Sequence, residues 1–106
     1  MEFEVRAYES KIGRNYYREW LFSLDKVTAR IVARRVTRLE DANFGDVKPV
    51  GEGVSELRID YGPGYRVYFG QAGREIILLL CGSDKSGQER TIVKAKALWR
   101  EFKENK

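Results

Sequence analysis

Basic and aromatic side chains that could bind phosphate stand on both sides of a turn sequence in the middle of the chain. Arg58 precedes the turn Tyr61–Tyr65, and Arg66 and Tyr68 follow it. The glycines and the proline of YGPGY are typical of a tight turn, so the flanking segments are predicted to form a β-hairpin. Successive side chains of a strand point to opposite faces, and these three residues are therefore expected on one face. Such a face suits a phosphate-bearing partner.

The register of this hairpin depends on the length of its loop. A three-residue loop at Gly62–Gly64 gives the hairpin one apolar, aromatic face and one polar face, and Glu56 joins Arg58 on the polar one. The predicted cross-strand pairs are Tyr61 with Tyr65, Ile59 with Val67, Leu57 with Phe69, Asp60 with Arg66, and Arg58 with Tyr68.

Clustered cations permit the cleavage of RNA without a metal ion. This reaction needs an acceptor for the 2′-OH proton, donors that stabilise the pentavalent phosphorane, and a proton donor for the leaving 5′ oxygen. Arginines on strands can bind the phosphorane, and a lysine crowded by other cations can transfer a proton near neutral pH. The candidate lysines for this step are Lys48 and Lys85. The predicted catalytic residues are Lys48, Arg58, Arg66 and Lys85.

The same arginines have a structural alternative. Arg58 and Arg66 would then pair with Asp60 and Glu56 across the strands and bind no ligand. The residue types alone leave these two readings open.

A basic ridge on a predicted helix supplies further candidates for RNA contact. Arg30, Arg34 and Arg38 recur at every fourth position of the predicted helix Lys26–Ala42, opposite its apolar stripe. A solvated helix face is the alternative explanation for such a ridge. The predicted RNA-binding residues are Arg30, Arg34, Arg38, Tyr68 and Arg90.

Residues that the sequence lacks exclude other mechanisms. The chain has no histidine and a single cysteine, Cys81, which lies in the apolar run Ile76–Cys81 and is expected to be buried. A catalytic triad cannot form, and no carboxylates stand at the spacing of a zinc site. We therefore predict no metal and no small-molecule cofactor.

Periodicity and turn residues predict a single α+β domain over residues 1–106. We expect the order β-α-α-β-β-β-α, with a small, mostly antiparallel sheet and helices packed on one face. The predicted elements are a strand at Glu2–Tyr8, helices at Tyr16–Leu24 and Lys26–Ala42, a strand at Asp46–Val50 that lies at an edge, the two hairpin strands, a central strand at Arg74–Cys81, and a helix from Ser86 to about Phe102.

Helix ends are predicted from capping residues. Asn15 and Asp25 are expected to cap the first two helices, and Gly45 to end the second. Ser86 with Glu89 has the spacing of a capping box for the last helix. The apolar periodicity of that helix is weak, which leaves loose docking or a partner contact open.

Composition and charge limit the partners and the compartment. Of 106 residues, 20 are Lys or Arg and 16 are Asp or Glu, so the net charge is +4, which favours a polyanionic partner. A lone cysteine fits a reducing compartment, and no segment is long and apolar enough to span a bilayer. We expect a cytoplasmic protein without membrane contact.

Two segments carry a resemblance to a known family: GDVKPVGEGVSELRIDYGPGYRVYF and LLLCGSDKSGQ. With their surroundings they resemble the RelE/ParE superfamily of bacterial toxins over almost the whole chain, and most closely the HigB-like "addiction module killer protein" group. The resemblance implies a RelE-like fold and a cognate helix-turn-helix antitoxin. It also implies ribosome-dependent cleavage of mRNA that leaves a cyclic phosphate, with contacts to ribosomal RNA.

The resemblance extends to the candidate residues. Lys48 matches a basic position on the second strand, Arg58 the arginine of the following strand, and Lys85 the basic segment after the last strand, while Arg66 lies on the adjacent strand. The chain departs from the pattern in two ways. It lacks the histidine of some HigB-type toxins and the tyrosine that RelE-type toxins place after the last strand.

Two other functions are compatible with the same resemblance. One is a ParE-like, non-enzymatic poison of DNA gyrase, and the other is an inactive toxin that only binds its antitoxin. A fold by itself does not decide between such functions. Clustered cations favour the endonuclease, because a gyrase poison does not need them aimed at phosphate.

Overall fold

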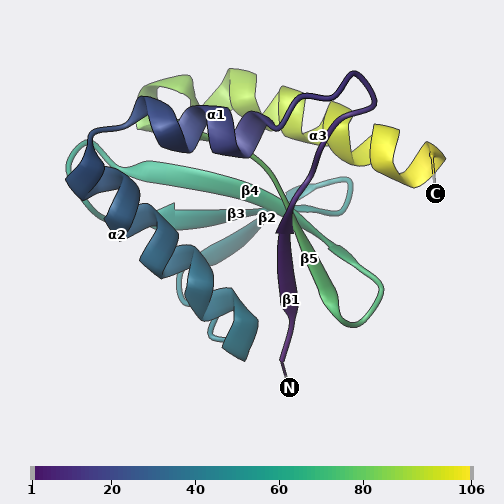
Figure 1. Ribbon diagram of the computed structural model, residues 1–106, viewed down its shortest axis with the longest axis horizontal. Helices are drawn as coiled ribbons and strands as arrows, with labels where there is room; N and C mark the ends of the chain where they lie inside the picture. The colour runs from purple at the N-terminus through teal and green to yellow at the C-terminus, as the bar shows by residue number, and fades with distance from the viewer. Residues whose placement is uncertain (1, 106) are drawn as a thin grey trace.

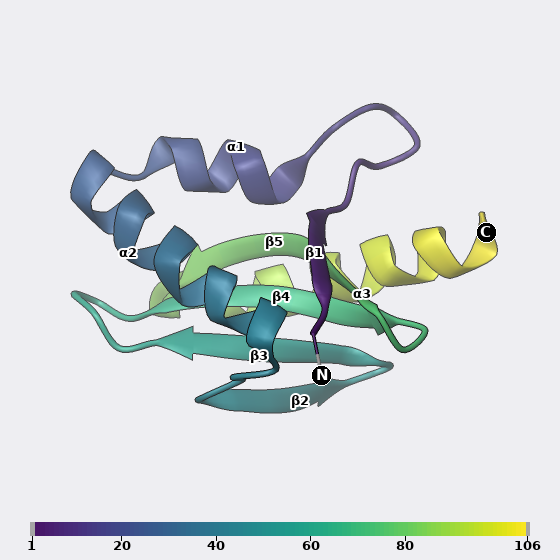
Figure 2. The ribbon, with the colours of Figure 1, turned by 60° about the horizontal axis from the view of Figure 1, so that its bottom comes forward.

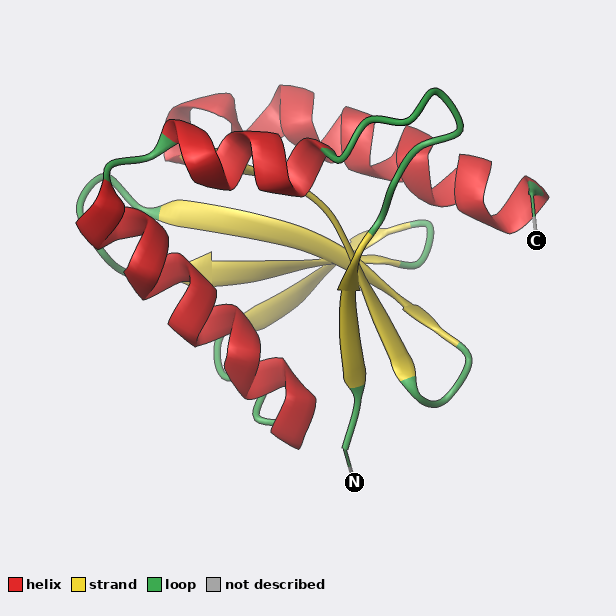
Figure 3. Cartoon of the chain, viewed as in Figure 1, coloured by secondary structure: helices red, strands yellow, loops and turns green. Residues whose placement is uncertain are grey.

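The computed structural model describes residues 2–105 as one five-stranded sheet with three helices (Figures 1 and 3). The strand order is β1-β5-β4-β3-β2, and all neighbours are antiparallel except β1 and β5, which are parallel. The predicted α+β class and the mostly antiparallel sheet are confirmed. The strands are β1 (Glu4–Ala7), β2 (Val47–Gly51), β3 (Val54–Ile59), β4 (Tyr65–Ala72) and β5 (Ile76–Asp84).

Four strands, and not three, follow the first two helices. The observed order is β-α-α-β-β-β-β-α, so the expected order β-α-α-β-β-β-α is one strand short. The strand predicted at Asp46–Val50 is present as β2, so the predicted elements include all four strands and the expected order omits one of them. β2 lies at the edge, where Pro49 needs no partner for a missing N–H.

The helices cover both faces of the sheet, and the prediction that all pack on one face is wrong. In Figure 2, α2 crosses in front of the strands and α3 lies behind them, while α1 packs into the same core as α2. The reason is a second hydrophobic core on the far face, where Leu98 and Trp99 of α3 pack against Leu80 and Val54. The helices are α1 (Tyr16–Ser23), α2 (Lys26–Thr37) and α3 (Gln88–Glu104), with short 3₁₀ helices at Arg38–Asp41 and Lys85–Gly87.

The central strand is apolar on both sides because both cores need it. Ile77 and Leu79 of β5 belong to the core under α1 and α2, whereas Leu78 and Leu80 belong to the core under α3. Cys81 is buried in the second core, as expected. A strand covered on both faces reads as a continuous apolar run, which is the pattern that placed β5 in the interior of the sheet.

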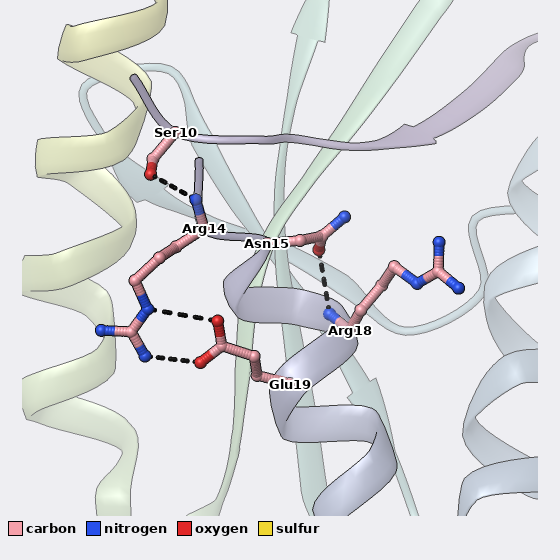
Figure 4. Close-up of polar contacts among 5 residues, drawn as sticks. All are labelled: Ser10, Arg14, Asn15, Arg18 and Glu19. Atoms are coloured by element: carbon pink, nitrogen blue, oxygen red, sulfur yellow. Dashed lines mark hydrogen bonds and ion pairs between the residues drawn. The ribbon is translucent and has the colours of Figure 1, made fainter. Parts of the chain in front are cut away.

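The predicted caps of the first two helices are confirmed. The Asn15 side chain accepts a hydrogen bond of 3.0 Å from the backbone N–H of Arg18, next to the paired Arg14 and Glu19 side chains (Figure 4). Asp25 caps α2 in the same way, accepting from Thr28 at 2.9 Å. Each side-chain oxygen satisfies an N–H that the first turn of a helix leaves unpaired.

Two other predicted helix ends are wrong. Ala42 adopts the left-handed conformation (φ 59°) and ends the 3₁₀ turn that follows α2, so Gly45 is not the terminating residue. At the start of α3, the Asp84 side chain accepts from the N–H groups of Ser86 and Gly87, and no Ser86–Glu89 capping box forms. A carboxylate is a stronger acceptor than the serine hydroxyl.

The hairpin has a longer loop than its turn sequence suggests. Residues 60–64 form the loop, Ile59 pairs with Tyr65, and Arg58 stands opposite Arg66. The partner of each β3 residue is therefore two positions earlier in β4 than predicted, as for Arg58, which pairs with Arg66 in place of Tyr68. A displacement of two keeps each side chain on its predicted face.

No helix of the described residues 2–105 has the length and apolarity needed to cross a membrane.

The packing of α3 leaves no room for a side chain at Gly70. A Cβ there would lie 2.5 Å from the ring of Trp99. Alanine normally stabilises a strand interior relative to glycine. We expect Gly70→Ala to lower the free energy of unfolding by about 1–3 kcal/mol, measured by urea denaturation, because the core becomes overpacked.

A double-mutant cycle isolates the cause. In a Trp99→Leu background, the same Gly70→Ala change is expected to cost less than about 0.5 kcal/mol, because the contacting ring is absent. An equal cost in both backgrounds would show that the ring does not set the packing of α3.

Candidate active site

A pocket beside the β3–β4 loop brings together three of the four predicted catalytic residues. Arg58 comes from β3, Arg66 from β4, and Lys85 follows β5. The backbone N–H of Lys85 donates to the carbonyl oxygen of Gly64 at 2.9 Å, which holds this part of the chain against the loop. We call this the sheet pocket. Its volume is about 280 Å³, and its lining residues are Asp46, Arg58, Ile59, Asp60, Gly62, Pro63, Gly64, Arg66 and Lys85.

A buried carboxylate lies beneath the two arginines. Glu56 has no exposed surface, and its Oε1 accepts a hydrogen bond of 2.9 Å from Nε of Arg58. The same oxygen lies 3.6 Å from Nε of Arg66, an ion pair that is too long for a hydrogen bond. Its Oε2 accepts from the Tyr68 hydroxyl at 3.0 Å and from Nε2 of Gln88 at 2.8 Å. Glu56 therefore ties β3, β4 and the start of α3 together.

The surroundings of Glu56 keep it ionised. Burial raises the pKa of the Glu56 carboxyl, but the hydrogen bonds from Arg58, Gln88 and Tyr68, with the charge of Arg66, outweigh burial and leave that pKa below its usual 4.5. For Tyr68, burial and the neighbouring Glu56 both raise the pKa. The hydroxyl thus stays protonated and remains a donor.

The alternative prediction, in which Arg58 and Arg66 pair with carboxylates of the protein itself, is therefore confirmed in part. Glu56 pairs with both arginines, as that alternative expected, whereas the described residues show no ion pair between Asp60 and either one. The Arg58 side chain is still 33% exposed, and only its Nε contacts Glu56. Its outer guanidinium nitrogens stay available to a ligand in the sheet pocket.

Lys48 stands apart from the other predicted catalytic residues. It pairs with Glu56 across β2 and β3, which places it on the same face of the sheet, but it is exposed and does not line the sheet pocket. The structure instead brings the carboxylates of Asp46 and Asp60 to the pocket. The backbone of Asp46 is fixed there because its carbonyl oxygen accepts from the N–H of Arg58 at 2.9 Å.

The predicted RNA-binding residues fall into three groups. Tyr68 is fully buried, so the prediction that it contacts RNA is wrong, and its hydroxyl binds Glu56 instead. Arg34 and Arg38 line a second pocket, between α2 and the β3–β4 loop. Arg30 on α2 and Arg90 on α3 are exposed and line neither pocket.

The sequence analysis did not assign a role at the site to three residues that the fold brings to it from other parts of the chain. Gln88 is separated from Glu56 by 32 positions, and no motif signals their hydrogen bond. Asp46 and Asp60 flank strands, and their role at the pocket depends on the five-residue loop. Within residues 2–105, no group of three histidine, cysteine or acidic side chains is placed to hold a metal ion.

Comparisons with known proteins place the chain in a family. No protein-family model matches it. A protein of Haemophilus influenzae with the name "Uncharacterized protein" is 45% identical over 84 residues, which are 78% of this chain and 85% of the relative. The chain therefore belongs to the same protein family as this Haemophilus influenzae protein.

Removal of the Glu56 charge is expected to destabilise the fold. Glu56→Gln leaves two arginines without their buried counter-charge, and we expect a loss of about 3 kcal/mol or more in the free energy of unfolding at pH 7. The matched control is Glu52→Gln, because Glu52 is an exposed carboxylate that pairs with Arg100, and its loss should stay below about 1 kcal/mol. Urea denaturation measures both, and equal losses would contradict the account.

The pH dependence provides an independent check of the same carboxylate. A lowered pKa in the folded state means that Glu56 stabilises the protein above pH 4.5, and this contribution disappears as the pH falls through the folded pKa. Between pH 7 and pH 3, the wild type should lose stability more steeply than Glu56→Gln. Parallel curves would show that the pKa of Glu56 is the same in the folded and the unfolded protein, and a shallower loss for the wild type would show that Glu56 is protonated in the folded protein.

Proposed function

We propose that this protein is the toxin of a bacterial type II toxin–antitoxin module and cleaves mRNA on the ribosome without a metal ion. The observation that carries the proposal is the meeting of Arg58, Arg66 and Lys85, from three separate elements, at one pocket. The resemblance of the same segments to RelE/ParE toxins supports it, as does the α+β architecture. The proposed partners are a helix-turn-helix antitoxin and ribosome-bound mRNA, with contacts to ribosomal RNA.

The sheet pocket contains groups for each step of the reaction. Asp46 or Asp60 accepts the 2′-OH proton as the 2′ oxygen attacks phosphorus. Arg58 and Arg66 bind the phosphorane oxygens, and Glu56 fixes their orientation before the substrate arrives. The bond to the 5′ oxygen then breaks, and Lys85 protonates that oxygen. The products are a 2′,3′-cyclic phosphate and a 5′-OH.

This assignment differs from the one that the sequence suggested. Lys48 was a candidate for proton transfer, but its position outside the sheet pocket favours Lys85 and the two aspartates. Lys48 is proposed to contact the RNA backbone as it enters from the edge of the sheet.

One observation favours a non-enzymatic toxin as the second candidate. The three cations of the sheet pocket face three carboxylates, counting Glu56 beneath them, so the pocket has no excess positive charge. A poison of DNA gyrase, or an inactive toxin that only binds its antitoxin, needs no such excess.

Variants of the pocket are expected to lose toxicity, and Lys85→Ala does so without removing a partner of the buried Glu56. Arg58→Ala and Lys85→Ala change partly or fully exposed side chains, and each should lower the cleavage rate about a hundredfold, because a phosphate or proton contact is lost. Inducible expression, followed by growth curves and primer extension on cellular mRNA, measures both effects. Lys103→Ala is the matched control, because Lys103 is exposed on α3 and lines neither pocket, and it should keep the activity.

The same experiment separates the alternatives. Codon-phased cuts that depend on Arg58 and Lys85 agree with the proposal. An SOS response with intact mRNA would identify a gyrase poison, and no growth defect would identify an inactive toxin. Full toxicity of both variants would show that the sheet pocket is not the active site.

A further inference from the structure

The second pocket has a stronger excess of positive charge than the first. It lies between α2 and the β3–β4 loop, and its volume is about 370 Å³. We call it the α2 pocket. Three arginines line it against one carboxylate, that of Asp60, and the ion pairs of residues 2–105 include none of these arginines. The arginines are Arg34, Arg35 and Arg38.

Arg35 presents a guanidinium that the protein satisfies only in part. Its Nη2 donates to the carbonyl oxygen of Phe44 at 2.9 Å, while its Nη1 is buried and has no hydrogen-bond partner among residues 2–105. A side chain at position 45 would collide with this guanidinium, and Gly45 leaves the room for it. Burial, followed by the charge of Arg38, lowers the pKa of Arg35. A buried donor without a partner is costly, so the position of this guanidinium is not explained by its contacts within the protein alone.

The remaining walls of the α2 pocket are apolar and aromatic. Ile31 and Ile59 line it, and Tyr61 stands at its rim with 40% of its surface exposed. An exposed tyrosine offers a face on which a base can stack. The volume lies in the range of about 300–1,000 Å³ that is typical of small-ligand sites. Arginines with an aromatic ring suit a nucleotide better than a bare phosphate.

We propose that the α2 pocket binds one nucleotide of a single RNA strand, with its phosphate on the arginines and its base on Tyr61. The two pockets share Ile59 and Asp60, so they lie next to each other at the β3–β4 loop. The loop between β3 and β4 projects from the end of the sheet (Figures 1 and 2), and residues 31–38 line the α2 pocket together with it. The strand passes around this loop, from the sheet pocket to the α2 pocket. This inference rests on the proposed function and names a second contact for its substrate.

An acidic protein segment is the competing ligand. Its carboxylates would also pair with the arginines of the α2 pocket. It would gain little from an exposed tyrosine ring, because the negative face of the ring does not attract a carboxylate. The aromatic rim therefore favours RNA.

Binding to an RNA that cannot be cleaved tests the inference separately from catalysis. The probe is a fluorescein-labelled 2′-O-methyl RNA hexamer, in which no 2′-OH can attack, and fluorescence anisotropy measures its dissociation constant. Arg34→Ala/Arg38→Ala should weaken binding at least about tenfold and lower the slope of the salt dependence by about 0.7 per lost contact. The matched control, Arg74→Ala/Lys103→Ala, removes two exposed cations outside both pockets and should change the dissociation constant less than about threefold.

A second pair of measurements tests the base contact. Tyr61→Ala should weaken binding of the hexamer about fivefold or more and leave binding of an abasic hexamer unchanged, because only the stacked base is lost. Tyr61→Phe should bind like the wild type. A labelled hexaglutamate peptide should bind far more weakly than the RNA.

The outcomes decide the inference without deciding the proposed function. Equal losses in the two double variants, a wild type that does not bind the hexamer, or an equal effect of Tyr61→Ala on both hexamers would overturn it. Tight binding of hexaglutamate would assign the pocket to a protein partner. If the RNA binds as expected but wild-type protein cuts no mRNA, the nucleotide site stands and the endonuclease proposal fails.

Discussion

The structure depends on one buried charge. Glu56 has no exposed surface, and every side chain that satisfies it comes from its own strand, the neighbouring strand or the last helix. A buried carboxylate is tolerated only when donors and opposite charges surround it. That requirement fixes the positions of Arg58 and Arg66 and the start of α3 at the same time. These contacts hold the two arginines and the start of α3 against one carboxylate.

The same interaction has opposite consequences for function. It orients the two arginines before any ligand arrives, which favours the binding of a transition-state charge. It also neutralises part of their charge, so the sheet pocket attracts anions less than its arginines suggest. The α2 pocket, with three arginines and one carboxylate, compensates for this on the other side of the β3–β4 loop. Attraction and chemistry would then belong to two neighbouring pockets.

Periodicity in the sequence was sufficient to predict the helices and strands and the face of the hairpin on which each side chain lies. Alternation placed Arg58 and Arg66 on one face correctly, even though the loop length and every cross-strand pair were wrong, because the error was two residues. The caps at Asn15 and Asp25 were equally local and were predicted correctly. Interactions between distant segments were not predictable in this way. The contact of Gln88 with Glu56 and the packing of Trp99 on Gly70 arise only when α3 covers the second face of the sheet.

The most direct measurement of the central claim uses a ribosome programmed with a defined mRNA that carries one 2′-deoxynucleotide at the position of cleavage. If the sheet pocket promotes attack by the 2′ oxygen, purified protein should cut the unmodified mRNA to a 2′,3′-cyclic phosphate and a 5′-OH, and should leave the deoxy mRNA intact. Cleavage of both mRNAs, or products with a 5′-phosphate, would contradict this mechanism. No cleavage of either mRNA would contradict the assignment of an endonuclease.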